Sequence, residues 1–354
     1  MTLHDMKMNM KRTTRYHSYG AALLAAVLLL LTFSCAKEKA TGSNDNSRLY
    51  FESWMKVHYP EVKPTGLGVY IIEDTPGQGE TLTDDDAFIF IRYTATDLEG
   101  TITGTTEEDV DKQLGNYSQS NYYGEEIFAN SSENTSAGLV ELVKGMKIGG
   151  TRKGVIPGWL NVSEQYSTEQ EYLDNCTGSD MICTVTLTGK TDDIYKWEID
   201  TLERFAARYM GGVDSTEFGY YYKQLREPDD TASIRTDSTI CINYVGRLMD
   251  GKVFDTTIED TAKVWGIYSP SKQYAPVYIS LAAEYPDITM SSTESGEGST
   301  MVDGFSYCLS NMKKNEKGIV AFYSVYGYGT NGKGSIPKYA PISFEIELVP
   351  KPEE

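Results

Sequence analysis

One spacing, 151 residues, recurs along the chain, and it limits the chain to a duplicated architecture. Several matches at a single offset indicate an internal repeat. Farther along the offset grows to 166, so the second copy is expected to carry about 15 extra residues between Thr257 and Gly304. The matches at 151 are Gly68-Val69-Tyr70 with Gly219-Tyr220-Tyr221, Tyr93 with Tyr244, Gly100 with Gly251 and Thr105-Thr106 with Thr256-Thr257; those at 166 are Gly138 with Gly304 and Met146 with Met312.

Each copy opens with an aromatic-rich stretch that is predicted to be helical, Leu49 to His58 in the first and Ile194 to Tyr209 in the second. We expect an α+β fold of two tandem domains, each with this lead-in helix, an antiparallel sheet wrapped on one short helix, and a final strand. A chain of 354 residues is long enough for two domains. The expected domains span 48–190 and 193–350, with the boundary at Thr191-Asp192-Asp193.

The N-terminal segment has the pattern of a secretory signal. Lys11, Arg12 and Arg15 precede an apolar run at 21–31, and Thr32-Phe33-Ser34-Cys35 resembles a lipobox. A single transmembrane helix is the alternative, but the run is shorter than the roughly 20 residues that a span needs. We therefore expect a signal peptide at 1–34, a lipidated Cys35 and a polar tether at 35–47. The protein would be lipid-anchored in the cell envelope, on the outer membrane facing the periplasm or on the surface.

The charge of the chain excludes one class of partner. Without residues 1–34, 28 basic and 50 acidic side chains remain, a net charge of −22. Such a field repels nucleic acid, so no nucleic-acid partner is expected. It keeps a tethered protein soluble and would favour basic segments of a polypeptide partner at low salt.

One stretch of the second copy predicts the rim of an apolar pocket. Ile240, Ile242 and Tyr244 alternate with polar or small residues, as in a strand with one buried face. Asp250-Gly251 is a strong turn signal, and Phe254-Asp255 then places a large ring beside a carboxylate.

This stretch resembles the front half of an FKBP-type peptidyl-prolyl isomerase domain, and the back half of that family follows in the same order. Several separated motifs in one order make the resemblance specific, and it implies two tandem FKBP-like domains. It runs from about Tyr221 to Val349. The motifs are Tyr244, the turn 248–251, Phe254-Asp255-Thr256-Thr257, Val302-Asp303-Gly304-Phe305, Met312, Gly327-Tyr328-Gly329, Ile336-Pro337 and the strand with Ile342, Phe344, Ile346 and Leu348.

The resemblance implies a peptidyl-prolyl cis-trans isomerase that acts on proline-containing polypeptide clients, needs no cofactor or metal, and could bind a macrolide inhibitor. It implies a cup for the proline ring made by Tyr244, Phe254, Phe305, Ile336 and Phe344. The Tyr328 hydroxyl and the Val302 N–H would donate hydrogen bonds to the carbonyls of the flanking peptide. Asp255 would orient the rim or respond to the rotating carbonyl dipole.

The first copy lacks most of these groups and is expected to be degenerate. At the same offsets, Thr103 and Gly104 replace Phe254 and Asp255, Leu139 replaces Phe305, and the region of Val162 replaces Tyr328. Tyr93 alone is kept. Matching Ile182, Val185 and Leu187 with Ile342, Ile346 and Leu348 places Cys183 where Phe344 stands.

Two departures from the family pattern affect the second pocket. Phe305 stands where the family usually has tryptophan, and Val277 stands near a position that is often phenylalanine. Both changes reduce apolar area, which predicts weak or selective activity. The insertion, placed at 258–300 with Trp265, Tyr268, Tyr274 and Tyr285, is expected to cover the pocket and to select or obstruct clients.

Other chemistries find little support in the sequence. The only histidines are His4, His17 and His58, which leaves no His-based triad or multi-histidine zinc site. The run 327–332 matches a dinucleotide G-x-G-x-x-G, but Ile336-Pro337 follows instead of a helix. Cys176, Cys183, Cys241 and Cys308 allow three disulfide pairings, and an unpaired core thiol is expected at Cys183.

A catalytically silent lipoprotein that uses both folds for peptide binding or assembly stays the alternative to an enzyme.

Overall fold

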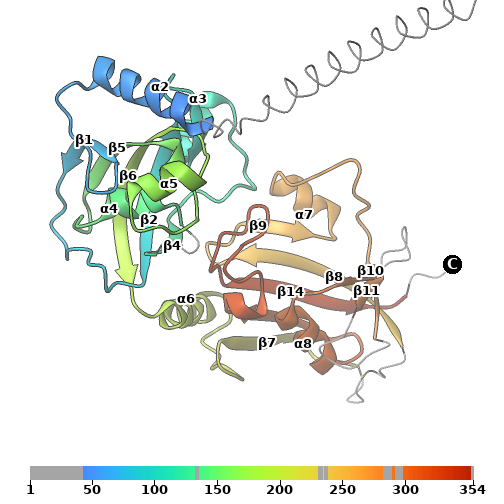
Figure 1. The fold of residues 1–354 in the computed structure, drawn as a ribbon. Helices are drawn as coiled ribbons and strands as arrows, with labels where there is room; N and C mark the ends of the chain where they lie inside the picture. Colours follow the sequence, from blue (N-terminus) through green and yellow to red (C-terminus); the bar gives the residue numbers. More distant parts are fainter. Residues whose placement is uncertain are drawn as a thin grey trace, which may run out of the picture.

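Two antiparallel sheets, each accompanied by helices, follow one another along the chain (Figure 1). The structure is a computed structural model that describes residues 43–131, 135–229, 234, 238–281, 289–291 and 298–351. It confirms the predicted α+β class and the duplicated organisation. The expected signal peptide and Cys35 lie outside the described residues.

The first sheet has the strand order β1-β5-β6-β2-β3, and β4 pairs with β2. Its strands and helices are α2 (Ser43–His58), β1 (Tyr70–Thr75), β2 (Phe88–Thr96), β3 (Ile102–Thr105), α3 (Glu108–Leu114), β4 (Glu126–Ala129), α4 (Ala137–Val143), β5 (Thr151–Ile156), η1 (Gly158–Leu160), α5 (Glu169–Asn175) and β6 (Met181–Thr191).

The second sheet has the order β12-β11-β10-β8-β14-β13-β7, and β9 pairs with β8. Its elements are α6 (Ile194–Tyr209), β7 (Tyr220–Arg226), β8 (Thr239–Leu248), β9 (Val253–Thr256), α7 (Glu259–Val264), β10 (Val277–Ser280), β11 (Thr289–Ser291), β12 (Gly298–Thr300), α8 (Asp303–Asn311), β13 (Lys317–Phe322), η2 (Ser324–Tyr326) and β14 (Ile342–Val349).

The two copies repeat each other down to single hydrogen bonds. Thr94 pairs with Thr105 in the first copy, and Val245 pairs with Thr256 in the second, at the same offset of 151. The Thr106 hydroxyl accepts from the Tyr93 N–H at 2.8 Å, and the Thr257 hydroxyl accepts from the Tyr244 N–H at 3.0 Å. The repeated tyrosine is therefore held on its strand in the same way in both domains.

The registers of the last strands correct one sequence match. Cys183 pairs with Gly154 as Phe344 pairs with Val320, so these two positions do correspond. The match of Ile182 with Ile342 is wrong, because Ile342 pairs with Phe322 and its counterpart Ile156 pairs with Met181. Apolar residues stand at both 181 and 182, so the apolar pattern alone could not fix the register there.

The extra residues of the second copy lie in a shorter segment than the insertion predicted at 258–300. The offset of 151 still holds for α3 with α7 and for β4 with β10, so it changes only between Ser280 and Val302. Tyr117 and Tyr123 stack at 5.8 Å in the first copy, as Tyr268 and Tyr274 stack at 5.4 Å in the second. Trp265, Tyr268 and Tyr274 therefore belong to the repeated unit, and Tyr285 lies outside the described residues.

One helix in each domain packs its apolar side on the sheet. On α8 and the residue after it, Phe305, Cys308, Leu309 and Met312 are buried at the helical spacing i, i+3, i+4, i+7. Leu139, Leu142, Val143 and Met146 repeat this spacing on and after α4. Burial of one such side chain stabilises the fold by about 1.5–3 kcal/mol, and these helices therefore anchor the two cores.

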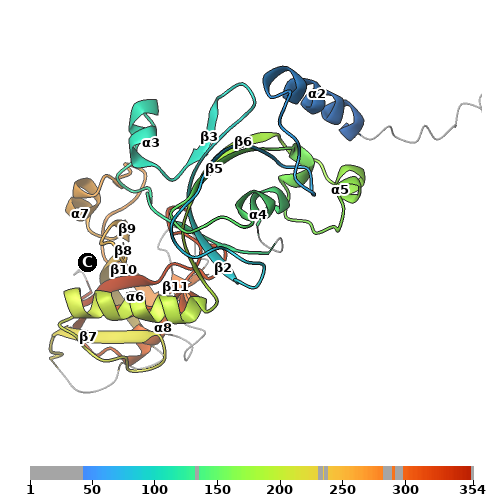
Figure 2. The ribbon, with the colours of Figure 1, turned by 90° about the vertical axis from the view of Figure 1, so that its left-hand side faces the viewer.

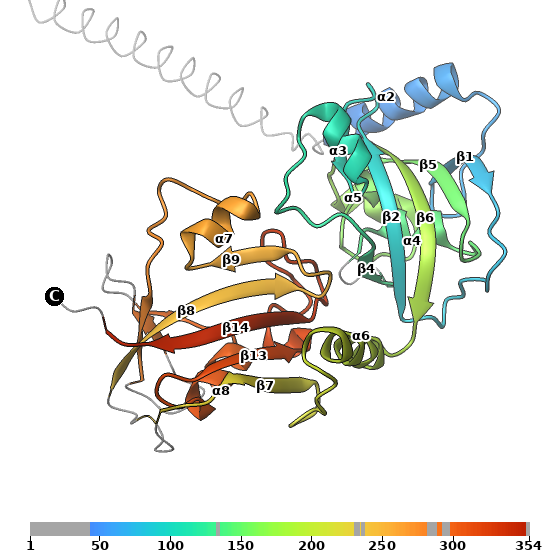
Figure 3. The same cartoon turned by 180° about the vertical axis from the view of Figure 1, so that it is seen from behind.

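The lead-in helix α6 also joins the domains (Figures 2 and 3). It starts at Ile194, as predicted, and only Asp192 and Asp193 separate it from β6. The Asp193 carboxylate accepts from the Lys196 N–H at 3.0 Å and so caps the helix. A buried apolar cluster then links the first sheet, α6 and the second domain through Phe90, Ile127, Ile194 and Tyr339.

The first lead-in helix is longer than expected. It begins at Ser43 rather than Leu49, so the last residues assigned to the polar tether are helical. Phe51 and Met55, one turn apart, are buried, and the Phe51 ring lies 5.3 Å from Trp159. Among the described residues, no helix combines the length and apolar character that crossing a membrane would require.

Candidate functional site

An open pocket of about 390 Å³ lies in the second domain and contains the predicted site. All eight residues predicted for the site line it, although they come from β8, β9, the start of α8, the turns after η2, and β14. They are Tyr244, Phe254, Asp255, Val302, Phe305, Tyr328, Ile336 and Phe344, and the remaining lining residues are Met301, Lys333, Gly334 and Ser335.

Aromatic rings around Phe344 form the floor and one wall of this pocket. Phe344 is 5% exposed, and its ring centroid lies 4.8 Å from Phe305 and 5.5 Å from Phe254. The Tyr244 ring lies 5.7 Å from Phe305. All of these contacts are edge-to-face, the arrangement that aromatic quadrupoles favour. The rings hold one another in place and leave an apolar hollow for a small ring.

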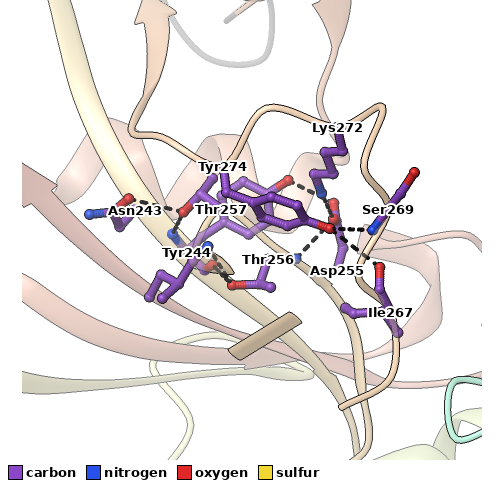
Figure 4. Close-up of polar contacts among 10 residues, drawn as sticks. Asn243, Tyr244, Asp255, Thr256, Thr257, Ile267, Ser269, Lys272 and Tyr274 are labelled. Atoms are coloured by element: carbon purple, nitrogen blue, oxygen red, sulfur yellow. Dashed lines mark hydrogen bonds and ion pairs between the residues drawn. The ribbon is translucent and has the colours of Figure 1, made fainter. Parts of the chain in front are cut away.

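A polar chain crosses the rim of the pocket (Figure 4). The Tyr244 hydroxyl donates to Asp255 Oδ2 at 2.6 Å, and the Thr256 N–H donates to Oδ1 at 2.8 Å. Lys272 forms an ion pair with the same carboxylate. Burial, together with the Asp255 charge, raises the pKa of Tyr244, so its hydroxyl stays protonated. Asp255 is thus fixed as a charged acceptor beside the apolar rings.

Tyr328 presents a second hydroxyl to the pocket. Burial and the Asp255 charge raise the pKa of Tyr328, so this group is a hydrogen-bond donor at neutral pH. Lys333 Nζ lies 5.4 Å from the centroid of the Tyr328 ring, a cation–π contact. On the other side, the Val302 carbonyl accepts from the N–H groups of Phe305 and Ser306 at 3.0 and 3.1 Å, so Val302 begins α8 at the pocket edge.

The prediction missed several groups of the site, above all Lys272 and Lys333. Lys272 lies 17 residues after Asp255 in an irregular loop, so no periodicity connects them. Its counterpart in the first copy is Asn121, whose side-chain amide donates to the Tyr123 hydroxyl at 3.4 Å. The change from Asn121 to Lys272, alongside the change from Gly104 to Asp255, was the available signal.

The first copy has no comparable set of rings at the equivalent positions. Leu139 and Cys183 are buried in its core, and Val162 packs against that core. Gly104 provides no carboxylate for the Tyr93 hydroxyl, and burial raises the pKa of Tyr93 to about 12. The Thr103 hydroxyl donates to the Ala95 carbonyl at 3.3 Å instead of presenting a ring.

The other sequence features contribute no further chemistry. After 327–332 the chain makes turns and then β14, and the Lys333 and Ile336 backbones hydrogen-bond each other at 2.9 and 3.0 Å. Between this run and residue 351, where the described chain ends, no helix follows that could hold a phosphate at its N-terminus. Cys183, Cys241 and Cys308 are buried free thiols, and Cys176 is buried as well. Within the described part of the chain, no group of His, Cys, Asp and Glu could hold a metal ion.

Comparison with known proteins gives the class of this domain. Residues 289–349 match the family model of the FKBP-type peptidyl-prolyl cis-trans isomerases. The match covers β11 to β14, including α8 and the Tyr328 turn, and it contains nine of the twelve residues that line the pocket. An FKBP-type domain therefore lies near the C-terminal end of the chain.

Two curated relatives are similar over part of the chain. A probable FKBP-type peptidyl-prolyl cis-trans isomerase of Haemophilus influenzae is 25% identical over 171 residues, 47% of this chain and 58% of the relative. The FKBP-type 22 kDa peptidyl-prolyl cis-trans isomerase of Escherichia coli K12 is 25% identical over 139 residues, 39% of this chain and 52% of the relative. The chain thus spans between half and three fifths of the length of these relatives.

Two solved structures are also similar. One, a wheat protein with three FKBP domains, is 16% identical with a TM-score of 0.27, covering 79% of this chain and 93% of the wheat chain. The other, a peptidyl-prolyl cis-trans isomerase of Pseudomonas syringae, is 24% identical with a TM-score of 0.30, covering 44% of this chain and 92% of its own.

Proposed function

We propose that the second domain is a peptidyl-prolyl cis-trans isomerase that acts on proline-containing polypeptide clients. The observation that carries this proposal is the convergence of eight predicted residues on one open pocket with an apolar floor and two tyrosine hydroxyls. The match of residues 289–349 to the FKBP-type family supports it.

Such a pocket can catalyse isomerisation without a nucleophile or a cofactor. The cis and trans forms of an X-Pro bond differ by less than about 1 kcal/mol, but a barrier of about 18–20 kcal/mol separates them. Amide conjugation is what resists rotation. A site that binds the twisted amide more tightly than either planar form lowers this barrier.

Each group of the pocket has a role in binding the twisted amide. The rings of Phe254, Phe305 and Phe344 would hold the proline ring and exclude water, which solvates the planar amide better. The Tyr328 hydroxyl and the Val302 N–H would hold the flanking carbonyls. Asp255, held by Tyr244 and Lys272, would orient the rim or respond to the carbonyl dipole as it rotates. A macrolide that mimics this substrate would compete for the pocket.

A second candidate function is peptide binding without catalysis, with both domains serving as binding or assembly modules. The first domain favours it, because Thr103, Gly104 and Cys183 replace a ring, a carboxylate and a second ring at the equivalent positions. In the second domain, Phe305 stands where the resembled family usually has tryptophan, which gives less apolar area. Measuring the rate of prolyl isomerisation distinguishes the two candidate functions.

We expect Tyr328→Phe and Phe254→Ala each to lower the rate of isomerisation of a proline tetrapeptide about tenfold, in the chain from residue 36 onward. The first removes a hydroxyl whose hydrogen bond is worth up to about 1.5 kcal/mol, roughly a factor of ten in rate, and the second removes a wall of the cup. Thr103→Ala, at the Phe254 position of the first copy, is the matched control and should leave the rate unchanged. A rate that neither pocket substitution changes would contradict the enzyme and leave the binding function.

We also propose that the protein is anchored to the cell envelope through a lipid on Cys35, on the outer membrane facing the periplasm or on the surface. The basic residues, apolar run and lipobox-like segment before Cys35 support this proposal. Cys35→Ser should move most of the protein from the membrane fraction to the soluble fraction of cells, measured by immunoblot. An unchanged distribution would contradict lipid anchoring.

A further inference from the structure

A buried carboxylate connects the lead-in helix α6 to the turn that carries Tyr328. Glu198 lies on α6 and is 0% exposed. Both of its oxygens bind Ser324: Oε2 accepts from the Ser324 N–H at 2.5 Å, and Oε1 accepts from the Ser324 hydroxyl at 2.8 Å. An acidic side chain is rarely buried without partners, and here one residue supplies both.

Ser324 in turn fixes the backbone on either side of Tyr328. The Ser324 carbonyl accepts from the N–H groups of Gly327 and Gly329, both at 2.8 Å. The Gly329 carbonyl accepts from the Tyr339 N–H at 2.9 Å. The position of Tyr328 therefore follows from the position of Ser324, and Glu198 holds Ser324.

We propose that Glu198 is a positioning residue for Tyr328, through which the helix between the domains sets the place of the Tyr328 hydroxyl in the pocket. The inference rests on the proposed isomerase function, because Tyr328 matters to catalysis only if that function is correct.

The first copy shows that the fold does not require the Glu198–Ser324 pair. At the same offsets, Ser47 stands at the position of Glu198 and Gly158 at the position of Ser324. There the Gly158 N–H donates to Asp180 Oδ1 at 2.8 Å, so a residue from the other end of the domain satisfies the same backbone group. The helix carboxylate and the serine hydroxyl are present in the copy that has Tyr328.

Protonation of Glu198 should alter this link near neutral pH. Burial raises the pKa of Glu198 to about 7. The other titratable groups that act on it are the Tyr323 and Tyr339 hydroxyls, and Tyr195 acts on both of those. Burial raises the pKa of Tyr323 and of Tyr339, so both hydroxyls are neutral near pH 7. The ionised carboxylate accepts both Ser324 bonds, whereas the protonated form must donate to the Ser324 hydroxyl. The link is tightest in the ionised form, because charge-assisted hydrogen bonds are the stronger ones.

The stability of the fold should change with pH in the opposite direction to the strength of the Glu198–Ser324 link. The pKa of Glu198 in the folded protein exceeds that of an unfolded glutamate, so its stabilising contribution is complete below about pH 4.5 and is lost as the pH rises through about 7. Glu198→Gln, which can accept from the N–H and donate to the hydroxyl, should remove this part of the pH dependence of Tm.

The test compares Glu198→Ala, Glu198→Gln and Leu202→Ala in the two-domain chain. We expect Glu198→Ala to lower kcat/KM about tenfold, and to add nothing in a Tyr328→Phe background. The wild-type kcat/KM should rise with pH with a midpoint near 7, and Glu198→Gln should show no such rise. Leu202 is also fully buried on α6 but packs in an apolar cluster with Phe205 and Tyr221, so Leu202→Ala should lower Tm with kcat/KM unchanged.

A second readout keeps the inference independent of activity. In protein labelled with 3-fluorotyrosine, the ¹⁹F resonance that disappears in Tyr328→Phe identifies Tyr328. It should shift with pH around 7 in the wild type, stay constant in Glu198→Gln, and move in Glu198→Ala but not in Leu202→Ala. Additive effects of Glu198→Ala and Tyr328→Phe, or a Tyr328 resonance that Glu198→Ala leaves in place, would overturn the positioning role. If the wild type has no isomerase activity but its Tyr328 resonance still responds to substitution of Glu198, the proposed isomerase function would be contradicted and the positioning role of Glu198 would stand.

Discussion

Phe344→Ala should lower the free energy of unfolding of the second domain by about 3–5 kcal/mol, the usual cost of truncating a buried phenylalanine. Phe344 lies on β14 between β8 and β13, and its ring contacts those of Phe305, Phe254 and Phe322. Removing it leaves a cavity next to an open pocket, and water entering from the pocket would not restore the lost contacts. Equilibrium unfolding in guanidinium chloride would measure the change.

The first copy provides the matched control for this prediction. Cys183 occupies the same register position, and Cys183→Ala removes one buried sulfur atom from a core without the ring cluster. We expect a loss of about 1 kcal/mol, from the first domain only. If both substitutions cost the same, the ring cluster would not be a main support of the second domain. Phe344→Ala should also abolish isomerisation, because the floor of the cup is lost.

Gly304→Ala should destabilise the second domain by roughly 3 kcal/mol, at the upper end of the usual cost of overpacking. A methyl group at Gly304 would lie 2.5 Å from the Phe322 ring, across the contact between α8 and β13. The Phe322 ring cannot move away easily, because it stacks between Tyr220 at 6.3 Å and Phe344 at 6.0 Å. Better helix propensity of alanine, worth about 1 kcal/mol at most, would not offset this clash.

The duplication again provides the comparison. A methyl group at Gly138 would lie 2.2 Å from Ile156 Cγ2 and 3.1 Å from the Leu160 carbonyl, so Gly138→Ala should destabilise the first domain to a similar extent. Gly66 has no atom within 4 Å of such a methyl group, and Gly66→Ala should be close to neutral. Thermal unfolding of the three variants would report these effects. A Gly304→Ala variant as stable as Gly66→Ala would show that helix and sheet can separate without cost.

The sequence was sufficient to predict those parts of the fold whose motifs occur in both copies. The repeated tyrosines and threonines located β2, β3, β8 and β9, and Gly138 and Gly304 located the two inner helices. The pocket residues could be found together because the order of the motifs carried the information; alternation alone would not have joined Tyr244 on β8 to Phe305 on α8.

The parts that sequence did not predict depend on tertiary contacts. Glu198 has the sequence appearance of an exposed residue on an amphipathic helix, and only the packing of α6 against η2 shows that it is buried. Lys272 meets Asp255 through an irregular loop. The early start of α2 was missed because Ser43 to Ser47 are polar and show no helical period of apolar residues.

The two-residue connection between β6 and α6 has a mechanical consequence. The described chain enters through α2, which lies on the side of the first domain away from the second (Figure 1). Because this connection is so short, the first domain lies between the pocket and anything that is attached to the N-terminal end of α2. If the N-terminal end is attached to a support, as proposed above, the first domain would act as a spacer between that support and the pocket.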